Sequence, residues 1–238
     1  MSVEQTLTQF KETEQGEAFS LQNSKLLKVE LADVTIQAKL GSMVAYQGDV
    51  RFEHAGSGGL SRMVKKAATG EGQSLMKISG SGEAFLADLA QDIHILKLED
   101  DSITANGTNV LALDADIDWD VKRVEGASGI LGGGLYNMHL EGSGHVALLS
   151  DGPPLLIEID GEGTYADPAS AITWSSGVTT SVKADVNLKT FVGRGSGEGL
   201  QVAFSGQGWA LIQPSEGRLT AQAGAGGAGG TIGKILGG

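Results

Sequence analysis

KISGSGEAFL (residues 77–86) returns along the chain as HLEGSGHVAL (139–148) and again as AFSGQGWALI (203–212). The first glycines of these copies stand at positions 80, 142 and 206, which are 62 and then 64 residues apart. Self-similarity at a nearly constant period is the sequence signature of a repeat architecture. We therefore expect one small sheet-forming unit to occur three times in tandem.

Each copy consists of an apolar strand, a Gly-x-Gly step and a second strand rich in Ala, Leu, Val or aromatic residues. Glycine inside a strand costs conformational entropy and offers no side chain for packing. Two glycines at this spacing indicate a bulge, a sharp bend or the close approach of another backbone. The predicted structural glycines of the repeat are Gly80, Gly82, Gly142, Gly144, Gly206 and Gly208.

The remaining sequence supports an all-β fold with three modules. Leu27, Val29 and Leu31 alternate with polar residues, as one buried face of a strand does. Asn106-Gly107 is a two-residue hairpin signal, and residues 114–121 alternate cleanly enough to predict one strand. The predicted segments are an arm with an edge strand (1–24), three β-modules (25–92, 93–153 and 154–216) and a flexible Gly- and Ala-rich tail (217–238).

Length and charge limit the functions that the chain can have. A unit of about 64 residues is marginal by itself, so the modules should pack edge to edge or in an oligomer. There are 29 acidic and 17 basic side chains, and the net charge of -12 disfavours nucleic acid as a partner. Cysteine is absent, the first 20 residues do not resemble a secretory signal, and no stretch is apolar enough to span a membrane. A cytoplasmic protein is therefore expected.

Two groups of residues invite a metal interpretation that the patterns do not favour. Asp114, Asp116 and Asp118 resemble the start of a calcium loop, but Trp119 stands where that loop needs glycine. His139 and His145 share a strand face, yet their spacing is not that of a β-barrel metal site. No nucleophile motif is present either. We predict no catalytic residues, no metal and no cofactor, and hence no enzyme.

One basic patch stands out on this acidic chain. Residues 60–68 of the first module are predicted to form a short helical insert that carries Arg62, Lys65 and Lys66. Such a patch could bind an anionic ligand, an acidic protein or the acidic surface of a neighbouring subunit. The alternative is an ordinary solvated helix face. The three residues are the candidate interaction patch.

Several segments together resemble the altered-inheritance-of-mitochondria protein twenty-four family, in particular its bacterial branch. The resemblance spans about residues 10–216 and implies a fold similar to the tryptophan RNA-binding attenuation protein, with a short double-stranded β-helix or β-sandwich module present three times. It also implies a homotrimer that forms a ring of nine modules. Mitochondrial members are associated with inner-membrane organisation. The segments are FSLQNSK (19–25), GSMVAYQG (41–48), TGE (69–71), FLAD (85–88), NVLA (109–112), SDGP (150–153) and FSGQG (204–208).

Three functions remain open at this point. The first is a non-catalytic, homo-oligomeric β-scaffold or interaction protein whose partner is unknown. The second is a sensor that binds a small ligand between adjacent modules, as the attenuation protein does with an amino acid. The third, ranked last, is a metal-dependent enzyme with its site in the mouth of a β-barrel.

Overall fold

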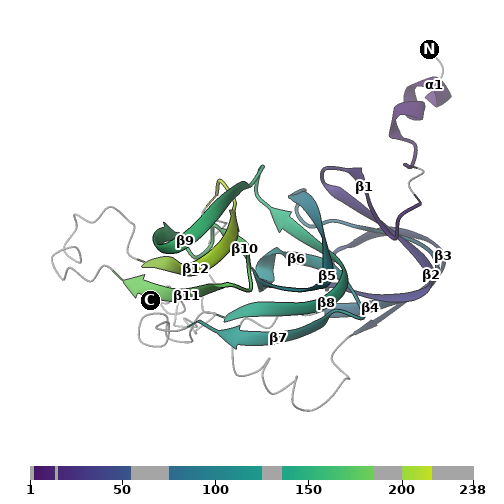
Figure 1. Ribbon diagram of the computed structural model, residues 1–238. Helices are drawn as coiled ribbons and strands as arrows, with labels where there is room; N and C mark the ends of the chain where they lie inside the picture. The colour runs from purple at the N-terminus through teal and green to yellow at the C-terminus, as the bar shows by residue number, and fades with distance from the viewer. Residues whose placement is uncertain (1–2, 14–15, 55–74, 125–135, 185–199, 216–238) are drawn as a thin grey trace, which may run out of the picture.

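The computed structural model describes residues 3–13, 16–54, 75–124, 136–184 and 200–215. Within them the protein is all-β, with twelve strands joined in one large antiparallel sheet (Figure 1). Two short helical turns precede the first strand, α1 (Val3–Leu7) and a 3-10 turn (Thr8–Phe10). The strands are β1 (Phe19–Asn23), β2 (Leu26–Lys39), β3 (Met43–His54), β4 (Leu75–Leu86), β5 (Asp92–Asn106), β6 (Val110–Asp114), β7 (Asp118–Arg123), β8 (Tyr136–Ser150), β9 (Leu155–Ala166), β10 (Ala171–Ser175), β11 (Val178–Ala184) and β12 (Leu200–Ile212).

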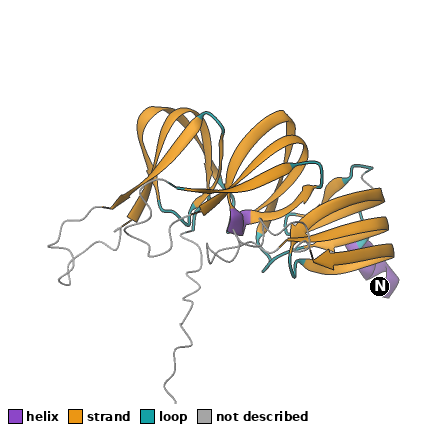
Figure 2. Ribbon diagram, turned by 90° about the horizontal axis from the view of Figure 1, so that it is seen from below, coloured by secondary structure: helices purple, strands orange, loops and turns teal. Residues whose placement is uncertain are grey.

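The three strands that carry Gly-x-Gly each lie between neighbours from the same part of the chain. Strand β4 lies between β2 and β3, β8 pairs with β5, β6 and β7, and β12 pairs with β9, β10 and β11. Pairing of β2 with β6 and of β5 with β10 joins these groups into one sheet. Figure 2 shows the resulting groups of curved strands side by side.

All six predicted structural glycines have positive φ, from 110° at Gly206 to 151° at Gly208. The long strand that pairs with each Gly-x-Gly strand is irregular next to the two glycines. The register shifts after Ala32 in β2 and after Leu98 in β5, and it shifts between Phe204 and Gly206 where β12 pairs with β9. A shift of this kind is a bulge, which bends a strand and increases its twist. The Gly-x-Gly steps therefore lie where the sheet curves.

Some of these positions also need glycine because the backbone of a neighbouring strand lies very close to them. A Cβ atom on Gly80 would overlap the carbonyl oxygen of Asp49, and one on Gly82 would overlap the carbonyl oxygen of Gln47. A Cβ on Gly206 would overlap the carbonyl oxygen of Gly177. Because a neighbouring backbone occupies the space of a side chain, only glycine fits without displacement.

The described residues bury three hydrophobic clusters rather than one. The first contains residues of β1, β2 and β4 with some of β6 and β8, the second is centred on β5, β6 and β8, and the third joins β9 to β12. The alternation predicted for β2 is present, since Leu27, Val29 and Leu31 are buried. Lys28, between them, is buried as well, and its partners are described below.

Two predictions about local structure are wrong. Asn106-Gly107 does not form a two-residue hairpin: a 3-10 turn (Gly107–Asn109) follows β5, and β5 and β6 both pair with β8. The Asn106 side chain accepts a hydrogen bond from the Thr108 amide, which stabilises this turn. Residues 114–121 are not one strand, because β6 ends at Asp114 and a turn precedes β7. The predicted insert at 60–68 and the predicted flexible tail at 217–238 lie outside the described residues.

Candidate interaction surface

The candidate patch predicted from sequence, Arg62, Lys65 and Lys66, lies outside the described residues and stays a prediction. Among the residues that the structure does describe, no three His, Cys, Asp or Glu side chains are placed to hold a metal ion together. The described polar groups instead form structural contacts between strands and one network beneath the N-terminal arm.

His145 connects two parts of the sheet. Its Nδ1 lies 3.0 Å from Asp114 Oδ2, and the same oxygen accepts a hydrogen bond of 2.8 Å from the His145 backbone amide. The imidazole stacks on Phe19 with 5.3 Å between the ring centres. Gly144 makes room for this contact, since a Cβ there would lie 2.9 Å from the same carboxylate oxygen.

His94 and His139 also have structural surroundings. His94 Nε2 lies 2.7 Å from Ser150 Oγ, and that hydroxyl donates to the carbonyl of Gly152. The serine therefore does not offer its proton to the imidazole, as a nucleophile would. Burial lowers the pKa of His94. Burial, together with the nearby Lys122, also lowers the pKa of His139, whose Nδ1 lies 3.4 Å from Thr104 Oγ1.

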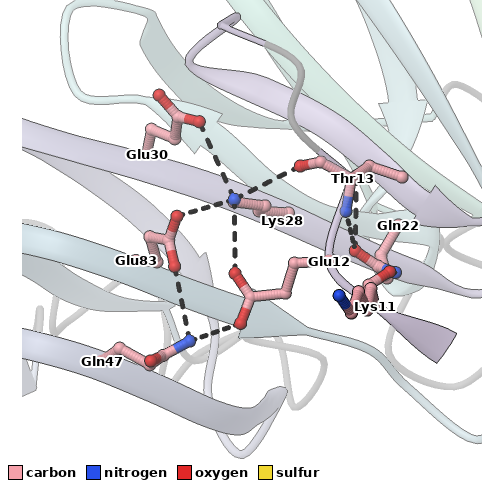
Figure 3. A network of polar contacts seen from close by, with 8 residues as sticks. All are labelled: Lys11, Glu12, Thr13, Gln22, Lys28, Glu30, Gln47 and Glu83. Carbon is pink, nitrogen blue, oxygen red and sulfur yellow. Dashed lines mark hydrogen bonds and ion pairs between the residues drawn. The ribbon is translucent and has the colours of Figure 1, made fainter. Parts of the chain in front are cut away.

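A buried lysine under the N-terminal arm holds a network of polar contacts (Figure 3). The side chain of Lys28 is 5% exposed, and its Nζ lies 2.6 Å from Glu83, 3.6 Å from Glu12 and 3.8 Å from Glu30. The hydrogen bond with Glu83 raises the pKa of Lys28, and the same bond lowers the pKa of Glu83. A buried cation is tolerated when it is paired in this way.

This network fastens the arm across the first part of the sheet. Glu12 also accepts a hydrogen bond of 2.5 Å from Gln47 on β3. The neighbouring Thr13 amide donates to the Gln22 side chain on β1, and that side chain donates in turn to the carbonyl of Lys11. Residues 11–13 therefore contact β1, β2 and β3 at once, as Figure 3 shows.

Five of the described strands, β1, β3, β7, β9 and β11, pair with one neighbour only, and two of them, β3 and β9, carry large exposed apolar side chains. Strand β3 ends the path of the sheet and pairs with β4 alone, and β9 pairs with β12 alone, among the described strands. On β3, Val44 is 61% and Tyr46 50% exposed. On β9, Leu156 is 59% and Tyr165 45% exposed. We call residues 43–47 of β3 and residues 155–166 of β9 the two free edges.

An unpaired edge is a template for another strand, because its backbone donors and acceptors have no strand partner. Proteins commonly protect such an edge with charged residues. Residues 43–47 carry no charged side chain. Exposed apolar residues on an open edge are therefore the feature of the described surface that most resembles a binding surface. Sequence reasoning missed it, although Met43, Val44 and Tyr46 were visible as a short apolar strand.

These observations define the protein as an all-β protein with one large antiparallel sheet and free edges at β3 and β9. The chain belongs to the family described as Mitochondrial biogenesis AIM24, whose model matches residues 19–215. The family resemblance predicted from the sequence is thus confirmed.

A solved structure agrees with this fold. It is the X-ray crystal structure of protein SPYM3_0169 from Streptococcus pyogenes, with a TM-score of 0.67, 24% sequence identity, and coverage of 83% of this chain and 92% of that one. At this identity the likeness shows the fold alone. No curated protein matches the chain. Within the described residues no helix is long and apolar enough to cross a membrane.

Proposed function

We propose that this protein is a non-catalytic, homo-oligomeric β-scaffold in which copies of the chain join through their sheets. The observation that carries the proposal is the pair of free edges. Val44 and Tyr46 on β3 and Tyr165 on β9 are about half exposed, and burying such side chains against a partner is favourable. A scaffold of this kind presents a large surface to further protein partners, whose identity the proposal leaves open.

The subunit of the scaffold, in this proposal, is a chain of three similar modules. Three features recur and support it: a central strand with two glycines at positive φ, a bulged or kinked strand beside it, and a hydrophobic cluster that contains residues of that central strand. The modules would be β2–β4, β5–β8 and β9–β12, and β1 would be the edge strand that the arm contributes. Each resembles the module of the tryptophan RNA-binding attenuation protein, and three chains would form a ring of nine modules.

Light scattering during gel filtration tests the oligomer. We expect a mass of about three times the 24.5 kDa of one chain, unchanged over a tenfold dilution in the micromolar range. A mass of one chain throughout that range would refute the scaffold as proposed.

Native mass spectrometry of protein purified from its own host tests the non-catalytic part of the proposal. A bare trimer is the expected result. A small molecule retained in stoichiometric amount would favour a ligand sensor, and a stoichiometric metal would favour a metal-dependent enzyme. Either of the last two results would replace the proposed function.

A further inference from the structure

Two joints between strands connect the glycine-bearing groups, and they share one design. In the first, residues 36–38 of β2 pair with residues 112–114 of β6. In the second, residues 103–105 of β5 pair with residues 173–175 of β10. Both joints are antiparallel and three residue pairs long. Each therefore joins the end of a long strand to the last three residues of a shorter strand further along the chain.

The long-strand halves of the two joints stand in the same register. Residues 36–38 and residues 103–105 both pair with the positions two to four residues before the first glycine of the adjacent Gly-x-Gly strand. In the third group, the positions in this register are residues 164–166 of β9, which pair with residues 202–204 before Gly206. Among the described strands, nothing pairs with the outer side of this segment. Residues 164–166 are thus a long-strand half without its counterpart.

The short-strand halves follow a matching rule. Leu113 and Trp174 each pair with the residue two positions after the second glycine, in β8 and β12 respectively. In the first group that position belongs to Tyr46 of β3, which pairs with Ala84 two positions after Gly82. Residues 45–47 are thus a short-strand half without its counterpart.

Burial separates the completed joints from the incomplete halves. At the central position, Leu113 is 0% and Trp174 3% exposed, whereas Tyr46 is 50% exposed. At the central position on the long-strand side, Gln37 is 8% exposed and Thr104 is half-buried, whereas Tyr165 is 45% exposed. A large apolar or aromatic residue therefore occupies the same register three times and is covered twice. The uncovered residue is Tyr46, and none of the described strands pairs with β3 on that side.

We propose that residues 45–47 of one chain pair antiparallel with residues 164–166 of a second copy, so that Tyr46 lies opposite Tyr165. This inference rests on the proposed homo-oligomer and specifies its interface. It fits a second copy better than a foreign strand because both incomplete halves belong to one chain. Strands β3 and β9 lie at opposite ends of the molecule (Figure 1), so the halves meet only between copies. Such a head-to-tail interface closes into a ring when the rotation between copies permits it.

Cysteine cross-linking reads the register directly, because the chain has no cysteine of its own. Directly opposed residues of antiparallel strands have Cα atoms about 4.5–5.5 Å apart, which is within the range of about 4.4–6.8 Å that a disulfide spans. We expect the double variant Tyr46→Cys/Tyr165→Cys, after mild oxidation, to give non-reducing gel bands at two and three times the 24.5 kDa of one chain. Reduction should return these bands to the single-chain position.

Matched variants show whether the cross-link depends on register. Tyr46→Cys/Leu156→Cys places the second thiol on the same strand, with similar exposure, but about 20–30 Å along β9. It should give less than a tenth of the cross-linked product. Each single variant should also stay uncross-linked, because a head-to-tail interface brings no residue opposite its own copy. A strong band from Tyr46→Cys alone would instead indicate pairing of β3 with β3 and would overturn the proposal.

A second measurement does not depend on disulfide chemistry. Tyr46→Lys places a charge in the proposed interface and should lower the light-scattering mass to one chain, with an unchanged far-ultraviolet circular dichroism spectrum. Tyr46→Phe keeps the ring and should keep the wild-type mass. If the wild type is a trimer and neither the double-cysteine nor the Tyr46→Lys result appears, the proposed interface is wrong while the oligomeric scaffold stands. If the wild type is a single chain, both proposals are wrong.

Discussion

Alanine at Gly80 should destabilise the fold by more than the backbone angle alone explains. Gly80 has a φ of 117°, and a Cβ there would overlap the carbonyl oxygen of Asp49 on the neighbouring strand. A positive φ costs an L-residue about 1–2 kcal/mol, and overpacking adds about 1–3 kcal/mol. We therefore expect Gly80→Ala to lower the free energy of unfolding by about 2–5 kcal/mol.

Two other glycines separate the contributions. Gly41 has a φ of 86° with no atom within 4 Å of a Cβ, so Gly41→Ala tests the angle alone. The positive φ should cost this variant about 1–2 kcal/mol in the free energy of unfolding. Alanine also lowers the conformational entropy of the unfolded chain, which offsets about 0.4–1 kcal/mol of that cost. Gly16 also has no atom within 4 Å of a Cβ, and its φ is outside the strained range. Gly16→Ala should therefore be neutral or slightly stabilising.

Urea unfolding followed by tryptophan fluorescence, at one fixed chain concentration, measures all three variants. Three tryptophans report the transition. For a chain of 150–250 residues, 1 kcal/mol corresponds to about 2–4 °C in Tm, so thermal unfolding gives an independent ranking. The expected order of stability is Gly16→Ala, then Gly41→Ala, then Gly80→Ala. If Gly80→Ala lowers the free energy of unfolding by no more than Gly41→Ala does, close backbone approach is not the reason for glycine at position 80.

Three further predictions concern the polar contacts. Lys28→Met should lower the free energy of unfolding by about 1–3 kcal/mol, because it leaves Glu83 without its lysine partner. The lowered pKa of Glu83 stabilises the wild-type fold above the ordinary pKa of 4.5, and this stabilisation is lost at lower pH. In urea unfolding between pH 6 and pH 3, the variant should therefore lose less stability on acidification than the wild type. Gly144→Ala should cost less in an Asp114→Ala background, with a coupling of about 1 kcal/mol in a double-mutant cycle, and strict additivity would contradict the contact. The His94 imidazole should titrate below 6.5 in an NMR pH series, since burial lowers its pKa, and a midpoint at or above 6.5 would contradict its burial.

Features that depend on the local pattern were predictable from sequence. The three Gly-x-Gly strands, the buried face of Leu27, Val29 and Leu31 and the edge strand at residues 19–23 are all present. Alternating apolar residues and glycines inside strands predict local structure, because their effect depends on only a few neighbouring residues. The same reasoning failed at Asn106-Gly107, because the Asn106 side chain caps a turn and β6 pairs with β8 instead of returning along β5.

The polar network and the free edges were beyond such reasoning. Lys28 and Glu83 are far apart in sequence, and their contact depends on the register between β2 and β4. Lys28 also breaks the rule that a strand's exposed face is solvated, since the arm covers it. Tyr46 and Trp174 look alike in sequence as aromatic strand residues, but one is half exposed and the other buried.

By itself, the sequence determined that the chain forms β-strands, where three of them bend, and to which family the chain belongs. The tertiary structure decided which strands meet, and hence which apolar residues are covered and which remain on a free edge. The physical reason is that side-chain alternation and glycine conformation act over a few residues along the chain. Pairings such as Gln37 with Leu113 join segments that only the folded sheet brings together.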